Sequence, residues 1–117
     1  MSCKVFNESD FGMIEGSTQT INLNIYNMIG EEYKNILIIK VEWRMSKYGE
    51  TECIISKNSD DNPSEVIFDK NNIEITLLAN DTFGLYGKYT HQAIITDYHS
   101  NIFIIDLGKI SIKPQIK

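Results

Sequence analysis

The chain has 117 residues, of which 42% are hydrophobic and 23% are charged, and its formal net charge is −5. This length predicts one domain over residues 1–117, and the apolar content suffices for one core, which excludes the disordered class. Because Arg44 is the single arginine, the chain lacks the basic stripe that neutralises phosphates, and we expect no nucleic-acid partner.

The opening stretch, MSCKVFNESDFG, has neither an apolar run of signal-peptide length nor a cleavage pattern. No run along the chain reaches the roughly 20 apolar residues that cross a bilayer. We therefore expect a soluble protein made in the cytoplasm, without a membrane partner. Cys3 and Cys53 lack metal-ligand spacing and are expected to be free thiols in a reducing compartment, although a pairing between them stays open.

Strands are predicted where apolar and polar residues alternate. The first predicted strand is 18–27, TQTINLNIYN, and a polar connection around Gly30 follows it. The second is 39–46, and a turn at KYGE leads to a shorter strand, 51–56. In the second strand four alternate residues are expected to face inward, namely Ile39, Val41, Trp43 and Met45.

The most polar stretch is KNSDDNP, which predicts an exposed loop closed by Pro63. Asp60, Asp61 and Glu65 offer carboxylate oxygens in this region, but they lack the ligand-every-second-residue order of a calcium loop. We therefore expect a solvated loop without a metal ion.

Three more strands are predicted beyond this loop: SEVIF, 72–78 and 88–96. A compact crossover, ANDTFGLYG, lies between the last two, and a final strand spans 102–112 with a bulge or bend at Gly108. The best helical candidate, IGEEYKNILIIK, is short and merges into a strand pattern. Seven or eight short strands with regular turns predict an all-β fold, a single antiparallel β-sandwich.

The crossover contains the residues that best indicate the kind of sandwich. Immunoglobulin-like domains often carry a tyrosine at this corner, whose hydroxyl bonds back to loop backbone. Tyr86 or Tyr89 fits that role, with Asp81 and Gly87 beside them, and Trp43 is the expected companion aromatic in the core. These are the candidate structural residues of an immunoglobulin-like sandwich.

His91 lies on the predicted strand 88–96, in the run GKYTHQAIITD. Catalysis by a histidine requires a nucleophile or an orienting carboxylate beside it, and the sequence offers no nucleophile elbow and no phosphate-binding glycine loop. We interpret His91 as an incidental sheet residue. The sequence therefore predicts neither an enzyme nor a site for a cofactor or a metal.

The C-terminal half resembles small immunoglobulin-like domains of phages and prophages, such as the N-terminal domain of phage baseplate upper proteins. The shared pattern is a strand, a loop of the form D-T…G, then G-x-Y-x-x-x-I-x-x-T-D, a polar turn and a final G-x-I-x-I-x-P. The matching residues are Gly87, Tyr89, Ile94 or Ile95, Thr96, Asp97, Gly108, Ile110, Ile112 and Pro114. The stretch EGSTQTINLNIYNMIGEE also resembles the opening of these domains.

The resemblance implies a structural or adaptor protein of a phage virion, in the tail, baseplate or neck. Its partners would be other virion proteins, and it would attach as a homo-oligomer or in several copies. It would lie in the host cytoplasm during assembly and then in the virion. Two alternatives stay open: a carbohydrate- or ligand-binding sandwich that uses exposed tyrosines, and a small phage-encoded inhibitor of an intracellular protein.

Overall fold

The computed structural model describes residues 11–24 and 37–116. These residues form eight strands and one helical turn, α2, which spans Ala79–Thr82. The strands, in chain order, are β1 (Phe11–Ile14), β2 (Gln19–Asn24), β3 (Ile38–Lys47), β4 (Cys53–Asn58), β5 (Val66–Asp69), β6 (Asn72–Leu77), β7 (Gly87–Asp97) and β8 (Ile102–Lys113).

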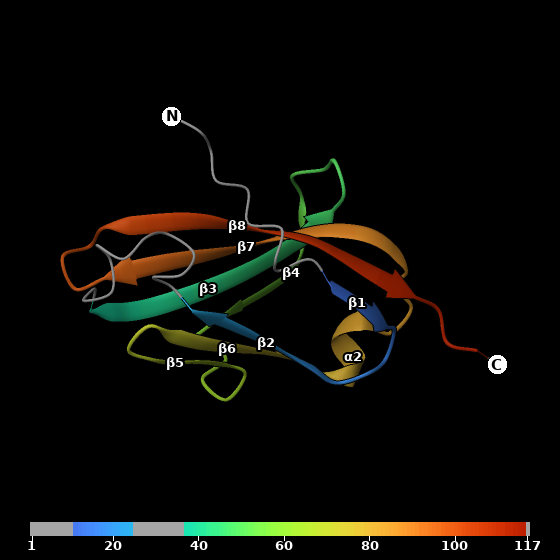
Figure 1. Ribbon diagram of the computed structural model, residues 1–117, viewed down its shortest axis with the longest axis horizontal. Helices are drawn as coiled ribbons and strands as arrows, with labels where there is room; N and C mark the ends of the chain where they lie inside the picture. Colours follow the sequence, from blue (N-terminus) through green and yellow to red (C-terminus); the bar gives the residue numbers. More distant parts are fainter. Residues whose placement is uncertain (1–10, 25–36, 117) are drawn as a thin grey trace.

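The strands form two sheets that pack face to face (Figure 1). One sheet has five strands in the order β1-β8-β7-β3-β4, and the other has three in the order β2-β6-β5. The predicted all-β sandwich is confirmed. The pairing of β1 with β8 is parallel, whereas every other described pair is antiparallel. β1 escaped the sequence analysis because it is only four residues long and contains a glycine, so it shows little alternation.

Alternate residues of the strands bury their apolar side chains between the sheets, as the period of two requires. The five-stranded sheet contributes Met13, Ile38, Val41, Trp43, Met45, Tyr89, Ala93, Ile95, Ile105, Leu107, Ile110 and Ile112. The three-stranded sheet contributes Ile21, Leu23, Val66, Ile73, Ile75 and Leu77.

The start of β3 departs from the predicted alternation. The alternation places Ile39 inward, but its side chain is 49% exposed, and Ile38 is buried instead. The register between β3 and β7 shifts between Ile38 and Lys40, so Ile39 is the extra residue of a bulge. One extra residue reverses the side to which the preceding positions point, and the prediction for Ile39 is therefore wrong.

A second bulge, at Gly108, was predicted and is confirmed. The register between β7 and β8 pairs His91 with Gly108 and Gln92 with Asp106, which leaves Leu107 as the extra residue. Gly108 has a φ of 97°, a conformation that a residue without Cβ adopts at little cost.

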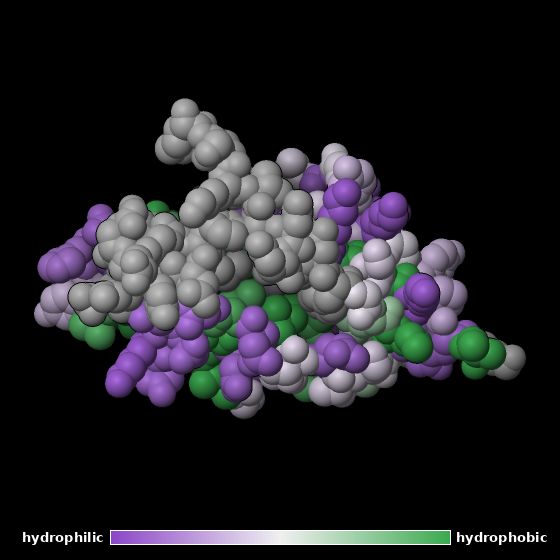
Figure 2. All heavy atoms as spheres, in the orientation of Figure 1, coloured by the Kyte–Doolittle hydropathy of each residue, from purple (hydrophilic) through white to green (hydrophobic). Residues whose placement is uncertain are grey.

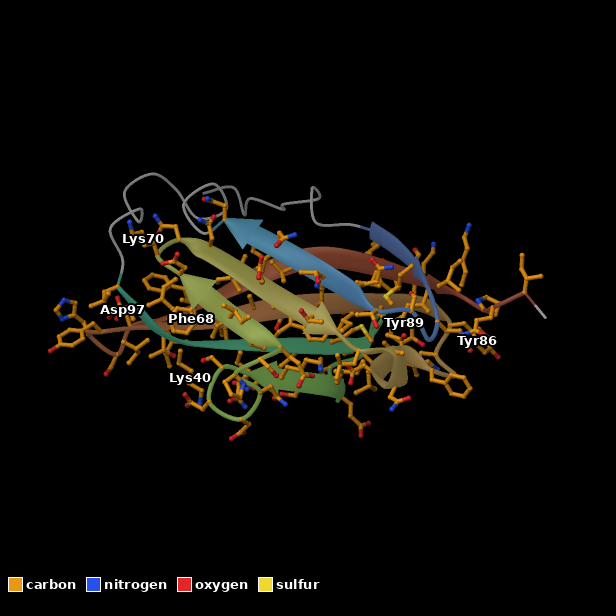
Figure 3. The ribbon with its side chains drawn as sticks, turned by 90° about the horizontal axis from the view of Figure 1, so that it is seen from below. Lys40, Phe68, Lys70, Tyr86, Tyr89 and Asp97 are labelled. Carbon is orange, nitrogen blue, oxygen red and sulfur yellow. The ribbon has the colours of Figure 1, made fainter. Side chains whose placement is uncertain are left out.

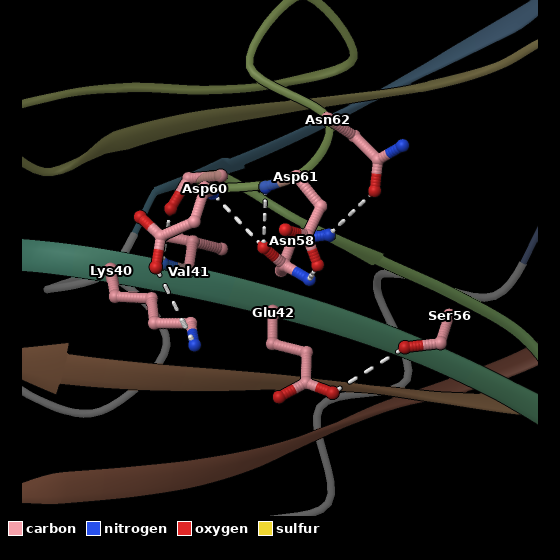
Figure 4. Close-up of polar contacts among 9 residues, drawn as sticks. Lys40, Val41, Glu42, Ser56, Asn58, Asp60, Asp61 and Asn62 are labelled. Atoms are coloured by element: carbon pink, nitrogen blue, oxygen red, sulfur yellow. Dashed lines mark hydrogen bonds and ion pairs between the residues drawn. The ribbon is translucent and has the colours of Figure 1, made fainter.

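The predicted exposed loop beginning at residue 57 is wrong for its first residue. β4 continues through Asn58, and the side chain of Lys57 faces inward opposite Trp43 with 4% of its surface exposed. The remaining loop residues lie at the surface, where Asn58, Asn62 and their neighbours form a network of turns (Figure 4).

Two further predictions concern particular segments. The predicted strand 18–27 is present as β2 up to Asn24, whereas the connection around Gly30 and most of the helical candidate lie outside the described residues. Within the residues that the structure describes, no helix is long and apolar enough to cross a membrane.

Candidate functional site

The crossover between β6 and β7 is fixed by a tyrosine hydroxyl. The side chain of Tyr89, at the start of β7, is buried, and its Oη donates a hydrogen bond of 3.0 Å to the carbonyl oxygen of Tyr86. Burial raises the pKa of the Tyr89 phenol, so the hydroxyl keeps the proton that it donates. Tyr86 contributes its backbone, while its own side chain is 66% exposed, and Gly87 between them has a φ of 112°.

Replacing Tyr89 by phenylalanine should lower the free energy of unfolding by about 0.5–1.5 kcal/mol, because the ring stays and one hydroxyl bond is lost. Urea denaturation monitored by circular dichroism measures this difference. Tyr86→Phe is the matched control, since the Tyr86 hydroxyl lies on an exposed side chain, and it should leave the midpoint unchanged. An unchanged midpoint for Tyr89→Phe would mean that the hydroxyl does not fix the crossover.

The helical turn α2 in the same crossover is capped by one of its own side chains and contacts two other parts of the chain. Asp81 Oδ2 accepts the backbone N–H of Leu78 at 2.6 Å and lies 2.7 Å from Lys57 Nζ on β4. The buried Thr82 accepts the backbone N–H of Gly16 through Oγ1 at 3.0 Å. The predicted site residue Asp81 thus joins the crossover to the edge of the five-stranded sheet.

The buried Lys57 completes a cluster of ion pairs that sequence reasoning missed. Its Nζ forms ion pairs with both Asp81 and Glu65, whose side chains are 24% and 20% exposed. Burial acts to lower the pKa of Lys57, but hydrogen bonds and attraction from Asp81 and Glu65 outweigh it, and the net pKa is raised. We refer to Lys57, Glu65 and Asp81 as the ion cluster.

Trp43 and His91 meet in the core, from the neighbouring strands β3 and β7. Trp43 is fully buried and His91 is 1% exposed. Trp43 Nε1–H donates to His91 Nδ1 at 3.0 Å, and the two rings meet edge to face with centroids 6.0 Å apart. Nδ1 is therefore the acceptor nitrogen of a neutral imidazole. In this position His91 packs and accepts a hydrogen bond away from solvent.

The acidic loop folds on itself through an asparagine (Figure 4). Asn58 Oδ1 accepts the backbone N–H groups of both Asp60 and Asp61, at 3.0 and 2.8 Å. The carboxylate of Asp60 pairs with Lys40 at 3.6 Å, and that of Glu65 belongs to the ion cluster. Among the described residues there is no group of three or more histidines, cysteines, aspartates or glutamates that could hold a metal ion.

We therefore expect millimolar Ca²⁺ to leave the melting temperature unchanged, because the carboxylates of Asp60 and Glu65 are turned toward lysines rather than toward one another. A thermal melt with and without calcium tests this. A rise in melting temperature that a chelator reverses would contradict the expectation.

A shallow pocket of about 200 Å³ lies across β3 and its two neighbours, β4 and β7. It is smaller than the roughly 300–1,000 Å³ of typical small-molecule sites, which are also mostly apolar. The guanidinium group of Arg44 lies in this pocket, and its Nε is 2.7 Å from Glu42 Oε2. This hydrogen bond and the negative charge of Glu42 raise the pKa of Arg44. The pocket is lined by Arg44, Met45, Ser46, Glu50, Thr51, Cys53, Thr90 and Gln92.

The predicted thiols are placed only in part. Cys53 is an exposed free thiol on β4, and its Sγ lies 3.0 Å from the carbonyl oxygen of Ile55. Cys3 lies outside the described residues, so what the sequence predicts for Cys3 stays a prediction.

The outer face of the five-stranded sheet carries exposed apolar side chains near one end. Ile94 on β7 pairs with Ile104 on β8, and Ile102 lies two residues away on the same face. The backbone N–H of Tyr98 bonds to the carbonyl of Leu37 at 2.8 Å, which places both residues at this end. We define the isoleucine patch as the exposed side chains Leu37, Ile39, Tyr98, Ile102 and Ile104 together with the half-buried Ile94.

The outer face of the three-stranded sheet is polar by comparison. Its cross-strand pairs are Thr20 with Thr76, Asn22 with Glu74 and Asn24 with Asn72. Figure 2 shows hydrophilic residues gathered at the lower left, over the β5–β6 turn of this sheet. The two outer faces therefore differ in kind, and the apolar one belongs to the five-stranded sheet.

Comparisons with known proteins support the fold and do not reach further. No protein-family model and no curated protein matches the chain. Among solved structures, CopC from Methylosinus trichosporium OB3b is 5% identical with a TM-score of 0.53, covering 91% of this chain and 86% of that chain. A chicken TCR is 13% identical with a TM-score of 0.58 and covers 92% of this chain, which spans about half (54%) of the TCR chain.

These likenesses confirm the predicted class: the chain is an immunoglobulin-like β-sandwich. In antibody domains a tyrosine near the start of one strand precedes a disulfide cysteine by two residues, and a buried tryptophan packs on that disulfide. Here Tyr89 precedes His91 by two residues, and Trp43 packs on His91. The resemblance to phage domains stays a prediction.

Proposed function

We propose that this chain is a protein-interaction domain, a structural or adaptor component of a phage-type virion, that binds neighbouring proteins through the outer face of its five-stranded sheet. The observation that carries the proposal is the isoleucine patch, in which Ile102 and Ile104 are 64% and 67% exposed. Exposed apolar patches rimmed by polar residues mark interaction sites. The virion assignment is supported by the sequence resemblance in residues 87–114.

The arrangement of tyrosines gives less support to a glycan-binding site. Figure 3 places Tyr86 at one end of the sandwich and Asp97, the neighbour of Tyr98, at the other. The third described exposed tyrosine, Tyr48, lies under Lys109 Nζ at 4.9 Å from the ring centroid. A sugar-binding platform requires aromatic faces side by side, and Tyr86 and Tyr98 do not provide one.

The experiment is gradient sedimentation of particles released from cells that make the chain, followed by immunoblotting. The wild-type chain should co-sediment with particles, and Ile104→Asp should be depleted from them at least tenfold because a carboxylate replaces an apolar contact. Ile67→Asp is the matched control, since Ile67 is exposed to 46% on β5 of the other sheet. A wild-type chain found only in the soluble fraction would contradict the virion assignment.

A further inference from the structure

We propose that the isoleucine patch is covered by a second copy of this chain in a twofold-symmetric contact that brings the two Ile104 side chains together. This inference rests on the proposed function, because it names the partner of the same surface. It follows from three properties of the patch: its area, the pairing of the charges around it and its position on the sheet.

The area of the patch is large for a monomer. Leu37, Tyr98, Ile102 and Ile104 are each 63–67% exposed, and Ile39 is 49% exposed. At roughly 100 Å² for each such side chain, these residues present on the order of 500 Å², near the top of the range for the largest apolar patch on a monomer. A standard interface buries about 800 Å² on each partner, so the patch and its polar surroundings match one half of a dimer.

The positive charges on this face are paired within the chain, whereas the exposed Asp106, two residues along β8 from Ile104, accepts the backbone N–H of Gly108. Lys40 lies 3.6 Å from Asp60, and Arg44 lies 2.7 Å from Glu42. A face whose positive charges are already paired offers no field that selects a strongly acidic partner. A second copy therefore fits this surface better than an acidic partner.

The position of the patch suits a symmetric contact. Ile94 and Ile104 are direct cross-strand partners on β7 and β8, and β7 has β3 on its other side, whereas β1 pairs with β8 only farther along, from Ile110 to Lys113. A contact made by this face uses side chains and leaves every described ladder intact. In a twofold contact the same residues of both copies meet, so one substitution changes the interface twice.

Sedimentation velocity of the purified chain tests the proposal directly. At about 100 µM, where a micromolar dissociation constant gives mostly dimer, the wild type should sediment as a dimer, and it should dissociate on dilution. Ile104→Asp and Ile104→Lys should each be monomeric, because two like charges meet in the contact. An equimolar mixture of these two variants should regain the dimer, because opposite charges then meet.

Three controls make the outcomes decisive. Ile67→Asp on the other sheet should keep the dimer, and circular dichroism should show every variant folded, since Ile104 is exposed. Because the chain carries a net charge of −5, added salt should strengthen association between copies, whereas it would weaken binding to a basic partner. A monomeric wild type, a dimer that persists in Ile104→Asp, or a mixture that stays monomeric would overturn the proposal.

The proposed adaptor function and the proposed self-contact can be contradicted independently of each other. A monomeric chain that still co-sediments with particles would leave the adaptor function standing and remove the self-contact. A chain that dimerises through Ile104 but is absent from particles would keep the self-contact and remove the virion assignment.

Discussion

Trp43→Ala is expected to lower the free energy of unfolding by about 3–5 kcal/mol, the range for deleting a large buried aromatic side chain. Trp43 is fully buried on β3, which has β4 on one side and β7 on the other. The substitution leaves a cavity that the flanking strands cannot close. It also removes the indole N–H that His91 Nδ1 accepts at 3.0 Å.

Urea denaturation, with the midpoint and the slope both fitted, measures this loss. Trp43→Phe separates the two contributions, because it keeps an aromatic ring in the cavity and deletes the hydrogen bond; its cost should be clearly smaller. Trp43 is the single tryptophan, so its fluorescence reports on this site alone. Native emission like that of free tryptophan would contradict a buried position.

Substitutions of His91, the acceptor, test the same hydrogen bond with Trp43. His91 is 1% exposed, so a substitution there changes the packing and the hydrogen bonding of the core. Glutamine can still accept the Trp43 N–H through its side-chain oxygen, whereas His91→Leu cannot. We therefore expect the leucine variant to be the less stable of the two, by about 1–3 kcal/mol for the unpaired donor.

The double substitution of Glu65→Gln and Asp81→Asn is expected to cost about 3 kcal/mol at neutral pH. Both changes keep the shape and remove the negative charge, so that the ammonium of Lys57 stays buried without a counter-charge, and breaking a buried ion pair in this way costs roughly 3–5 kcal/mol. The lower end applies because water reaches both carboxylates, which are 20–24% exposed.

Adding Lys57→Met to the double variant should restore most of the stability, since an apolar chain of similar length then fills the site. Lys40→Met, at the exposed pair with Asp60, is the matched control and should change stability by less than about 1 kcal/mol. A double variant as stable as the wild type would show that the ion cluster contributes nothing.

The pH dependence of the ion cluster follows from the raised pKa of Lys57. Folding favours the charged amine, so the cluster contributes its full stability below the ordinary lysine value of 10.5 and loses it as the pH rises through the higher value in the folded protein. At neutral pH the wild type therefore has the whole contribution.

The pattern of alternation predicted the strands well, because burial on one face of each strand leaves a period of two in the sequence. It failed where geometry breaks that period. The bulge at Ile39 contains no glycine, so the sequence did not indicate it, whereas Gly108 indicated the bulge in β8. Lys57 was assigned to a loop because a lysine in a polar run indicates solvent, and its carboxylate partners are 8 and 24 positions away in the sequence.

Other features depend on contacts that no local pattern records. The sequence singled out Tyr86 and Tyr89 together, and only the structure assigns the hydroxyl bond to Tyr89 and the carbonyl to Tyr86. Likewise, the sequence predicted the strands 88–96 and 102–112, but the meeting of Ile94 with Ile104 depends on which strands pair and in which register. The isoleucine patch therefore emerged only from the fold.

The parallel pairing of β1 with β8 has a mechanical consequence. Phe11 lies beside Ile110 and Ile14 beside Lys113, so the N-terminal end of β1 and the C-terminal end of β8 are at opposite ends of the pair. Tension applied across these two ends runs along the strands and strains all four register pairs at once, in shear, instead of peeling them one after another. In a single-molecule pulling experiment the pair should yield in one rupture; stepwise release at low force would contradict this geometry. A domain held in this way resists load that is applied along these two strands.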